Sequence, residues 1–171
     1  RALHAAPGEV LRDIYEESQG PTGSLDLERI FALGTGFGEF STEALIELAA
    51  CIESGDVVVE TIELPFADWD LRRLATFSGR TVAHQRLCAR VACWLESRGT
   101  GWSAHNPDLD YAGGRADVVA KDHSIVAECG YTKASKILAG LKAGTRCLVA
   151  PYDGGAYLFT ARDGRLAPTD Y

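Results

Sequence analysis

The amino-acid sequence predicts an α/β fold in which a mixed central sheet is flanked by helices, with an N-terminal, mainly helical extension. Apolar side chains recur at helical spacing in residues 41–55 and again in residues 82–97. From residue 81 onward, helical patterns alternate with short runs rich in valine and isoleucine. The expected order there is α-β-β-β-α-β-β, and such an order favours a sheet between layers of helices.

The first 80 residues are expected to form a mainly helical accessory region, and residues 81–171 the core. Helices are predicted at residues 8–18 and near residues 25–33. The clearest helix is the stretch STEALIELAACIESG, in which Ser41 or Thr42 is a suitable N-cap. A strand, DVVVETIEL, and a short helix after it complete this region.

The core begins with a helix that Thr81 can cap and that runs to about Ser97. A strand near residues 102–106 follows, and then a hairpin with short β-branched arms. A helix over residues 133–143 and the strands RCLVAPY and AYLFTAR end the predicted core.

The hairpin GRADVVAKDHSIVAECG carries one acid on each arm, Asp117 on the first and Glu128 on the second. If the turn is centred on Asp122 and His123, Asp117 and Glu128 are directly opposed. Opposed residues have Cβ atoms about 4.5–5.5 Å apart, and like charges there destabilise the pair. A shift of one residue would instead place the two acids on opposite faces of the sheet.

Opposed carboxylates need compensation. Either one carboxyl takes up a proton, or a hard divalent cation such as Mg²⁺ or Mn²⁺ lies between the two. Two acids at solvated strand ends are the remaining interpretation.

The composition fits one ordinary globular core. The chain has 171 residues, 46% of them hydrophobic, and a formal net charge of −7. It contains no apolar run long enough to cross a membrane, and its five cysteines are scattered without a CxxC pair, which favours reduced thiols in a cytoplasm. The negative charge provides no general attraction to phosphate, so a nucleic-acid partner would be held by a local basic surface or through a metal.

A helix, three strands with an Asp on the second and a Glu on the third, and then a helix and a strand resemble the core of the PD-(D/E)XK nuclease superfamily, which has the restriction-endonuclease-like fold. The resemblance covers roughly residues 81–160. It implies that Asp117 and Glu128 bind Mg²⁺ or Mn²⁺ and that the backbone carbonyl of Cys129 adds a ligand.

The family places a lysine two positions after the Glu, where this chain has Gly130. Some members take the lysine from the following helix, and Lys133 and Lys136 lie there, three residues apart. Lys136 is the better substitute because it precedes the apolar pair Ile137-Leu138, which would fix the helix against the sheet. Lys133 stays an alternative, as does the interpretation of both lysines as solvated.

The helix at residues 82–97 opens with further polar residues. His84 and Gln85 stand where this fold often contributes an extra polar group to the metal site, although a partly buried, satisfied histidine is the simpler interpretation of His84. Arg86 and Arg90 are one turn apart and could contact a phosphate backbone. A solvated helix face is the simpler interpretation of the two arginines.

The resemblance implies a nuclease, a hydrolase that cleaves phosphodiester bonds with Mg²⁺ or Mn²⁺, as an endonuclease or an exonuclease. DNA is the expected partner, ahead of RNA, in a cytoplasmic protein that does not contact the membrane and that can form a homodimer. The alternative is a catalytically silent nuclease fold that binds nucleic acid or a protein. A third interpretation is an ordinary interaction domain in which the hairpin acids are incidental.

Overall fold

The computed structural model describes residues 27–31, 39–77, 81–104, 116–152 and 154–168. The helix expected at residues 8–18 lies outside these ranges. Within them, no helix has the length and apolar character that crossing a membrane requires.

Six strands form one mixed sheet in the order β1-β6-β5-β4-β3-β2. Strands β4 and β5 are parallel, and every other neighbouring pair is antiparallel. The strands are β1 (Val57–Ile62), β2 (Trp102–Ser103), β3 (Val118–Ala120), β4 (Ile125–Cys129), β5 (Arg146–Ala150) and β6 (Ala156–Ala161).

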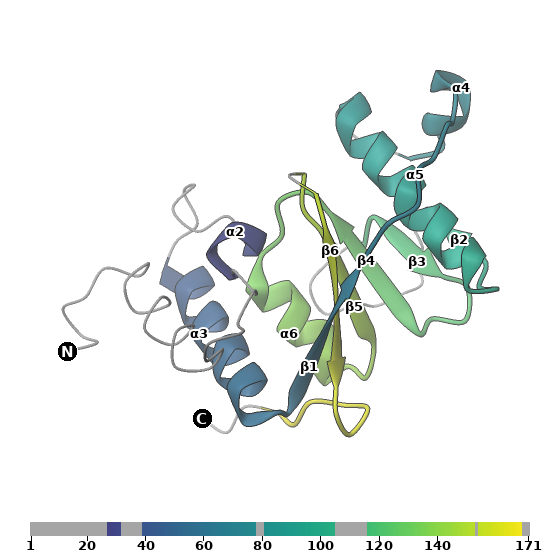
Figure 1. Ribbon diagram of the computed structural model, residues 1–171. Helices are drawn as coiled ribbons and strands as arrows, with labels where there is room; N and C mark the ends of the chain where they lie inside the picture. Colours follow the sequence, from purple (N-terminus) through teal and green to yellow (C-terminus); the bar gives the residue numbers. More distant parts are fainter. Residues whose placement is uncertain (1–26, 32–38, 78–80, 105–115, 153, 169–171) are drawn as a thin grey trace.

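Helices cover both faces of this sheet (Figure 1). The described helices are α2 (Leu27–Phe31), α3 (Glu39–Ser54), α4 (Leu71–Leu74), α5 (Val82–Ser97) and α6 (Ala134–Lys142). Apolar side chains of α2, α3 and α6 pack on one face of the sheet, and those of α4 and α5 pack on the other. From residue 81 the elements follow the expected order, and the predicted mixed sheet between helices is confirmed.

The helix boundaries follow local signals closely, with one exception. Thr81 caps α5 as predicted, because its hydroxyl accepts a hydrogen bond from the backbone N–H of His84 at 3.1 Å. Helix α3, however, begins at Glu39, so the expectation that Ser41 or Thr42 is the N-cap is wrong. No helix breaker separates Glu39 from Ser41, and an acidic residue in the first turn is favoured by the helix dipole.

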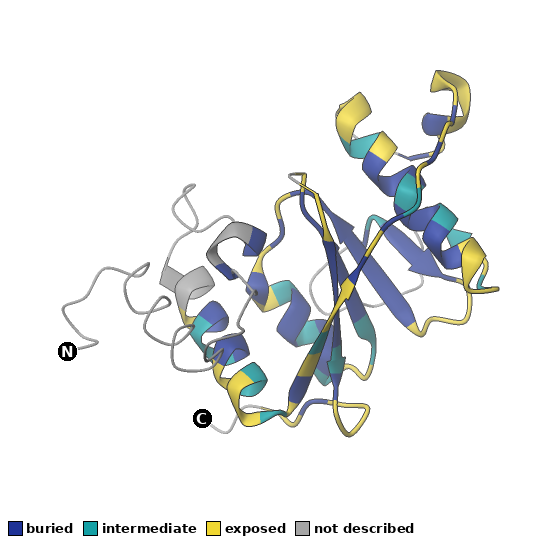
Figure 2. Ribbon diagram, in the orientation of Figure 1, coloured by how far each residue is buried: buried dark blue, intermediate teal, exposed yellow. Residues whose placement is uncertain are grey.

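The central strands are buried on both faces, as Figure 2 shows for β3, β4 and β5. In β4, Ile125, Ala127 and Cys129 belong to the cluster with α5, whereas Val126 belongs to the cluster with α6. Side chains alternate along a strand. Glu128 therefore extends toward the α6 side of the sheet.

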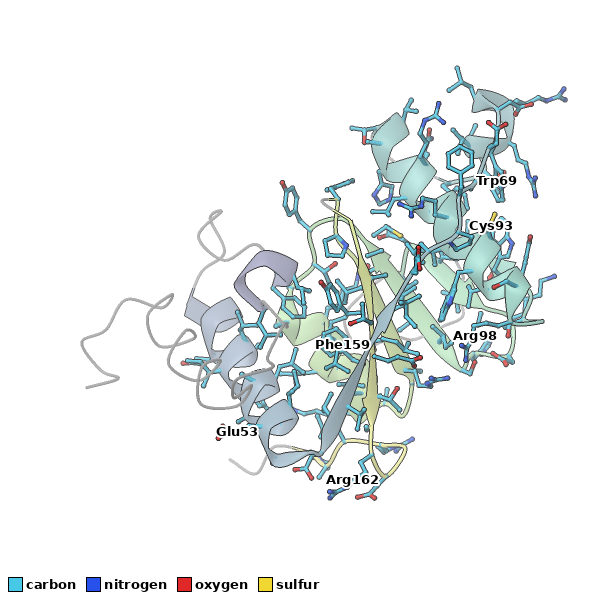
Figure 3. All side chains as sticks on the ribbon, viewed as in Figure 1. Glu53, Trp69, Cys93, Arg98, Phe159 and Arg162 are labelled. Carbon is cyan, nitrogen blue, oxygen red and sulfur yellow. The ribbon has the colours of Figure 1, made fainter. Side chains whose placement is uncertain are left out.

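The sheet takes strands from both of the expected regions. Strand β1, within the first 80 residues, pairs along its full length with β6. At one end of this pair Arg162, labelled in Figure 3, donates a hydrogen bond to the Asp56 carboxylate at 3.2 Å. Phe159 of β6, also labelled, packs against Phe31 of α2 with 6.0 Å between the ring centroids. The accessory region and the core thus share one sheet.

Arg90 of α5 holds the segment that follows β1. Its Nε donates to the Pro65 carbonyl at 3.2 Å and its Nη2 to the Leu64 carbonyl at 3.0 Å. Arg86, one turn earlier, is exposed. Of the two arginines expected on a phosphate backbone, Arg90 therefore has a structural role, whereas Arg86 faces solvent.

Replacing Arg90 should destabilise the fold, and replacing Arg86 should not. Arg90→Ala leaves two carbonyls without their charged donor, which typically costs about 1.5–3 kcal/mol. Arg86→Ala, on the same helix, should change the free energy of unfolding by about 0.5 kcal/mol or less. Urea unfolding of both variants measures the difference, and equal stabilities would contradict the role of Arg90.

Candidate functional site

The acids of the hairpin lie where several elements meet. Strands β4 and β5 are parallel and joined by α6, so the carboxyl end of β4 and the first turn of α6 lie at the same edge of the sheet. The start of β3 reaches this edge because β3 is antiparallel to β4. The first turns of α5 arrive there as well, since His84 contacts Asp117.

Across β3 and β4 the hairpin has the predicted register, but the ladder ends at Val118 and Ala127 and does not include the expected pair of Asp117 and Glu128. Val119 pairs with Val126 and Val118 with Ala127. Asp117 stands directly before β3, and its backbone N–H donates to the Ala127 carbonyl at 3.1 Å. Its Oδ2 accepts a hydrogen bond from the backbone N–H of Cys129 at 2.8 Å. The Asp117 carboxylate is thereby tied to the strand end next to Glu128.

Glu128 is a buried acid with a lysine beside it. Only 6% of its side chain is exposed, and its Oε1 lies 2.8 Å from Nζ of Lys136, whose side chain is 21% exposed. Oε1 has no hydrogen bond of good geometry, although the neighbouring Lys136 lowers the pKa of this carboxyl. Lys133, the other lysine considered, is exposed at the N-cap of α6.

Burial sets the protonation of Glu128. The pKa of this carboxyl is raised to about 8; burial is the main cause, Asp117 adds to it through its charge and a hydrogen bond, and Lys136 acts in the opposite direction. A buried acid beside a second acid tends to keep a proton. Without a metal, the two acids together therefore hold less than two negative charges near neutral pH.

His84 supports the other acid. Its Nε2 lies 3.4 Å from Oδ1 of Asp117, and its Nδ1 lies 3.4 Å from the Tyr152 hydroxyl. The hydrogen bond to Asp117 is the main cause that raises the pKa of His84 to about 11. Burial alone would raise the pKa of Asp117, but the bonds from His84 and from the Cys129 backbone lower it. Asp117 is thus the ionised member of the acid pair.

Two buried thiols, those of Cys88 and Cys129, lie next to the pair formed by His84 and Asp117. Cys88 Sγ is 3.5 Å from Nε2 of His84, and a hydrogen bond with Cys129 is the main cause that lowers the pKa of Cys88 to about 7. The same bond and burial raise the pKa of Cys129. Because the Cys129 side chain faces α5, only its backbone is directed to the acid pair.

Gly130 explains why no lysine stands two residues after Glu128. Its φ is +87°, a backbone conformation that residues other than glycine rarely adopt. A Cβ at this position would also lie 2.6–2.8 Å from ring and hydroxyl atoms of Tyr152. The positive φ and the position of the tyrosine ring therefore both disfavour a lysine here.

The structure gathers most of the predicted residues and separates the others. Asp117, Glu128, Lys136, His84 and the Cys129 backbone lie together. Gln85 donates instead to the Phe77 carbonyl at 3.1 Å, and Arg90 binds the carbonyls after β1. These two side chains thus bond to the backbone of segments outside the acid cluster.

Sequence reasoning missed Cys88 and Tyr152. Cys88 follows His84 by four residues, so helical spacing alone places both on one side of α5. Tyr152 stands two residues after the last residue of β5, and the neighbourhood of the ends of β4 and β5 becomes visible only once their parallel pairing is known.

The donors fit a hard divalent cation in kind. Asp117 and Glu128 offer carboxylate oxygens, which Mg²⁺ and Mn²⁺ prefer. Among the described residues, no three His, Cys, Asp or Glu side chains gather as a metal-binding group.

No protein-family model, curated protein or solved structure matches the chain. The residues and their geometry alone carry the functional interpretation.

Metal-free protein should lose stability as the pH rises from about 4.5 to about 8. The pKa of Glu128 is higher in the folded state than its ordinary value of 4.5, so the folded state binds the proton more tightly. The stability that this proton contributes is fully present below the ordinary pKa of 4.5 and is lost as the pH rises through the folded-state pKa of about 8. Glu128→Gln should flatten the slope in this window, measured by urea unfolding in EDTA. His84, with its raised pKa, should still cause a decline above about pH 6.5. An unchanged slope in Glu128→Gln would contradict the assigned protonation.

Proposed function

We propose that this protein is a metal-dependent nuclease that hydrolyses phosphodiester bonds, of DNA in preference to RNA. The observation that carries the proposal is the contact of Lys136 with buried Glu128, 2.8 Å between Nζ and Oε1, beside the Asp117 carboxylate. A lysine from the helix that follows β4 lies at the acid pair, while the position two after Glu128 has a φ that disfavours any side chain.

The order of elements supports the same assignment. Strands β2, β3 and β4 form an antiparallel meander, α6 crosses over, and β5 pairs in parallel with β4. Asp117 stands directly before the second of these strands and Glu128 on the third. The resemblance to the restriction-endonuclease-like fold implies this order of elements with the Asp on the second strand, whereas Asp117 lies one residue before it.

Each residue of the cluster has a definite role in the proposed reaction. Asp117 and Glu128 would hold Mg²⁺ or Mn²⁺, and the Cys129 carbonyl would add a ligand. When bound, the cation supplies positive charge for the transition state and lowers the pKa of water. Lys136 would orient the attacking water or stabilise the developing charge on phosphate. His84 fixes the orientation of the Asp117 carboxylate.

The protonation of Glu128 makes cation binding depend on pH. A carboxylate must be ionised to act as a ligand, so binding releases any proton that Glu128 holds. Since burial raises the pKa of Glu128 to about 8, cation affinity should increase between neutral and mildly alkaline pH.

A catalytically silent fold that binds nucleic acid or a protein is the second candidate. The contact of Lys136 with Glu128 favours it, because a protonated Glu128 beside a lysine needs no bound cation to offset its burial. The formal net charge of −7 also gives no general affinity for phosphate.

Lys136→Ala should reduce cleavage of DNA about 10²- to 10⁴-fold, the usual contribution of a group that acts in the chemical step. Binding of Mn²⁺, measured by calorimetry at pH 8.5, should persist because both carboxylates remain. Lys133→Ala is the matched control, since Lys133 is exposed at the start of the same helix. Glu128→Gln should abolish cleavage and weaken Mn²⁺ binding together.

Other outcomes distinguish the alternatives. Loss of cleavage in Lys133→Ala alone would mean that the wrong lysine has been chosen. Absence of cleavage of DNA and RNA by the unaltered protein with Mg²⁺ or Mn²⁺, across pH 6–9, would favour the silent fold.

A further inference from the structure

Two tyrosines next to the acid cluster expose their rings to solvent. Tyr131 is 72% exposed and Tyr152 is 46% exposed. Their ring centroids lie 5.5 Å apart with planes at 72°, an edge-to-face contact. Aromatic rings bury large areas in most folds, so a paired exposure beside a candidate site points to a ligand.

Tyr152 is held in place by the site itself. Its ring lies over Gly130, in space that any side chain at that position would occupy. Its hydroxyl lies 3.4 Å from Nδ1 of His84, and Nε2 of the same imidazole lies 3.4 Å from the Asp117 carboxylate. One imidazole therefore separates the Tyr152 hydroxyl from an acid of the cluster.

Tyr131 is held outward by the turn between β4 and α6. It follows Glu128 by three residues, and its neighbour Thr132 is buried, with a hydroxyl that donates to the Gly130 carbonyl at 3.3 Å. The Thr132 side chain is buried, whereas the Tyr131 side chain extends into solvent and makes its edge-to-face contact with Tyr152.

We infer that Tyr131 and Tyr152 form a stacking surface for an unpaired nucleobase, and that single-stranded nucleic acid is the preferred substrate of the adjacent acid cluster. The inference rests on the proposed nuclease function, whose substrate class it narrows. A base next to the scissile phosphate would lie on the Tyr131 ring, while its phosphate reaches Lys136 and the acids.

Unpaired bases fit this surface better than a duplex does. Stacking on a side chain requires a free base face, and bases within a duplex are already stacked on their neighbours. Aromatic stacking is also independent of sequence and of charge. A chain with a formal net charge of −7 gains little from phosphate attraction, so ring contacts would have to supply much of its affinity.

The test is binding of a fluorescein-labelled oligodeoxyadenylate of about ten nucleotides, within the usual range of single-strand sites. Anisotropy is measured in EDTA and, in parallel, in Ca²⁺, so that no cleavage is needed. Tyr131→Leu should weaken binding about tenfold or more, because it removes the ring and keeps the apolar bulk. Tyr131→Phe is the matched control and should bind nearly as the unaltered protein does.

Two further readouts separate stacking from a structural effect. The loss in Tyr131→Leu should leave the salt dependence of binding unchanged, because no phosphate contact is removed. The unaltered protein should bind the single strand more tightly than a duplex of the same length.

Equal affinity of Tyr131→Leu and the unaltered protein in both buffers would overturn the inference, as would tighter binding of the duplex or no measurable binding of the single strand. Ring-dependent binding without cleavage would sustain the stacking surface while the proposed hydrolysis fails. Cleavage that persists with no ring dependence would sustain the nuclease and overturn the stacking surface alone. Capture of a protein by this surface, without single-strand binding, would also overturn it.

Discussion

The burial of Glu128 next to Asp117 is the constraint on which the rest of the site depends. A carboxylate with 6% of its side chain exposed loses most of its hydration, and a second carboxylate beside it increases the cost of ionisation. The protein offsets this cost with a raised pKa, which keeps the carboxyl protonated, and with a lysine 2.8 Å away. A protein that needed only stability would place an apolar residue here.

Neighbouring features follow from that constraint. Lys136 reaches Glu128 from α6, while Gly130, directly after β4, has a positive φ and the Tyr152 ring against it, which disfavour a lysine there. The imidazole of His84 keeps Asp117 ionised while Glu128 retains its proton. Two acids with opposite shifts in pKa are typical of sites that bind cations or move protons.

Sequence patterns predicted much of this arrangement. Helical periodicity and the Thr81 cap defined α5, and the turn at residues 122–123 fixed the register that brings Asp117 beside Glu128. The contact of Lys136 with Glu128 also agrees with the choice of Lys136 over Lys133, which rested on the apolar pair Ile137-Leu138 directly after it. Tertiary pairing decided the rest: the strand β1 joins β6, Arg90 binds carbonyls about 25 residues earlier in the chain, and Tyr152 meets His84 from a distant loop. Such contacts between distant segments leave no local periodicity to detect.

The position of a bound cation tests the central claim most directly. Crystals soaked with Mn²⁺ at a pH above about 8, where Glu128 is ionised, should give an anomalous density peak between the Asp117 and Glu128 carboxylates. Oxygens of both should lie about 2.0–2.3 Å from the peak, close to the distances that such hard cations adopt with carboxylates. Nζ of Lys136 should have moved away from Oε1 of Glu128. A peak at another place, or Glu128 still paired with Lys136 at saturating Mn²⁺, would contradict the account.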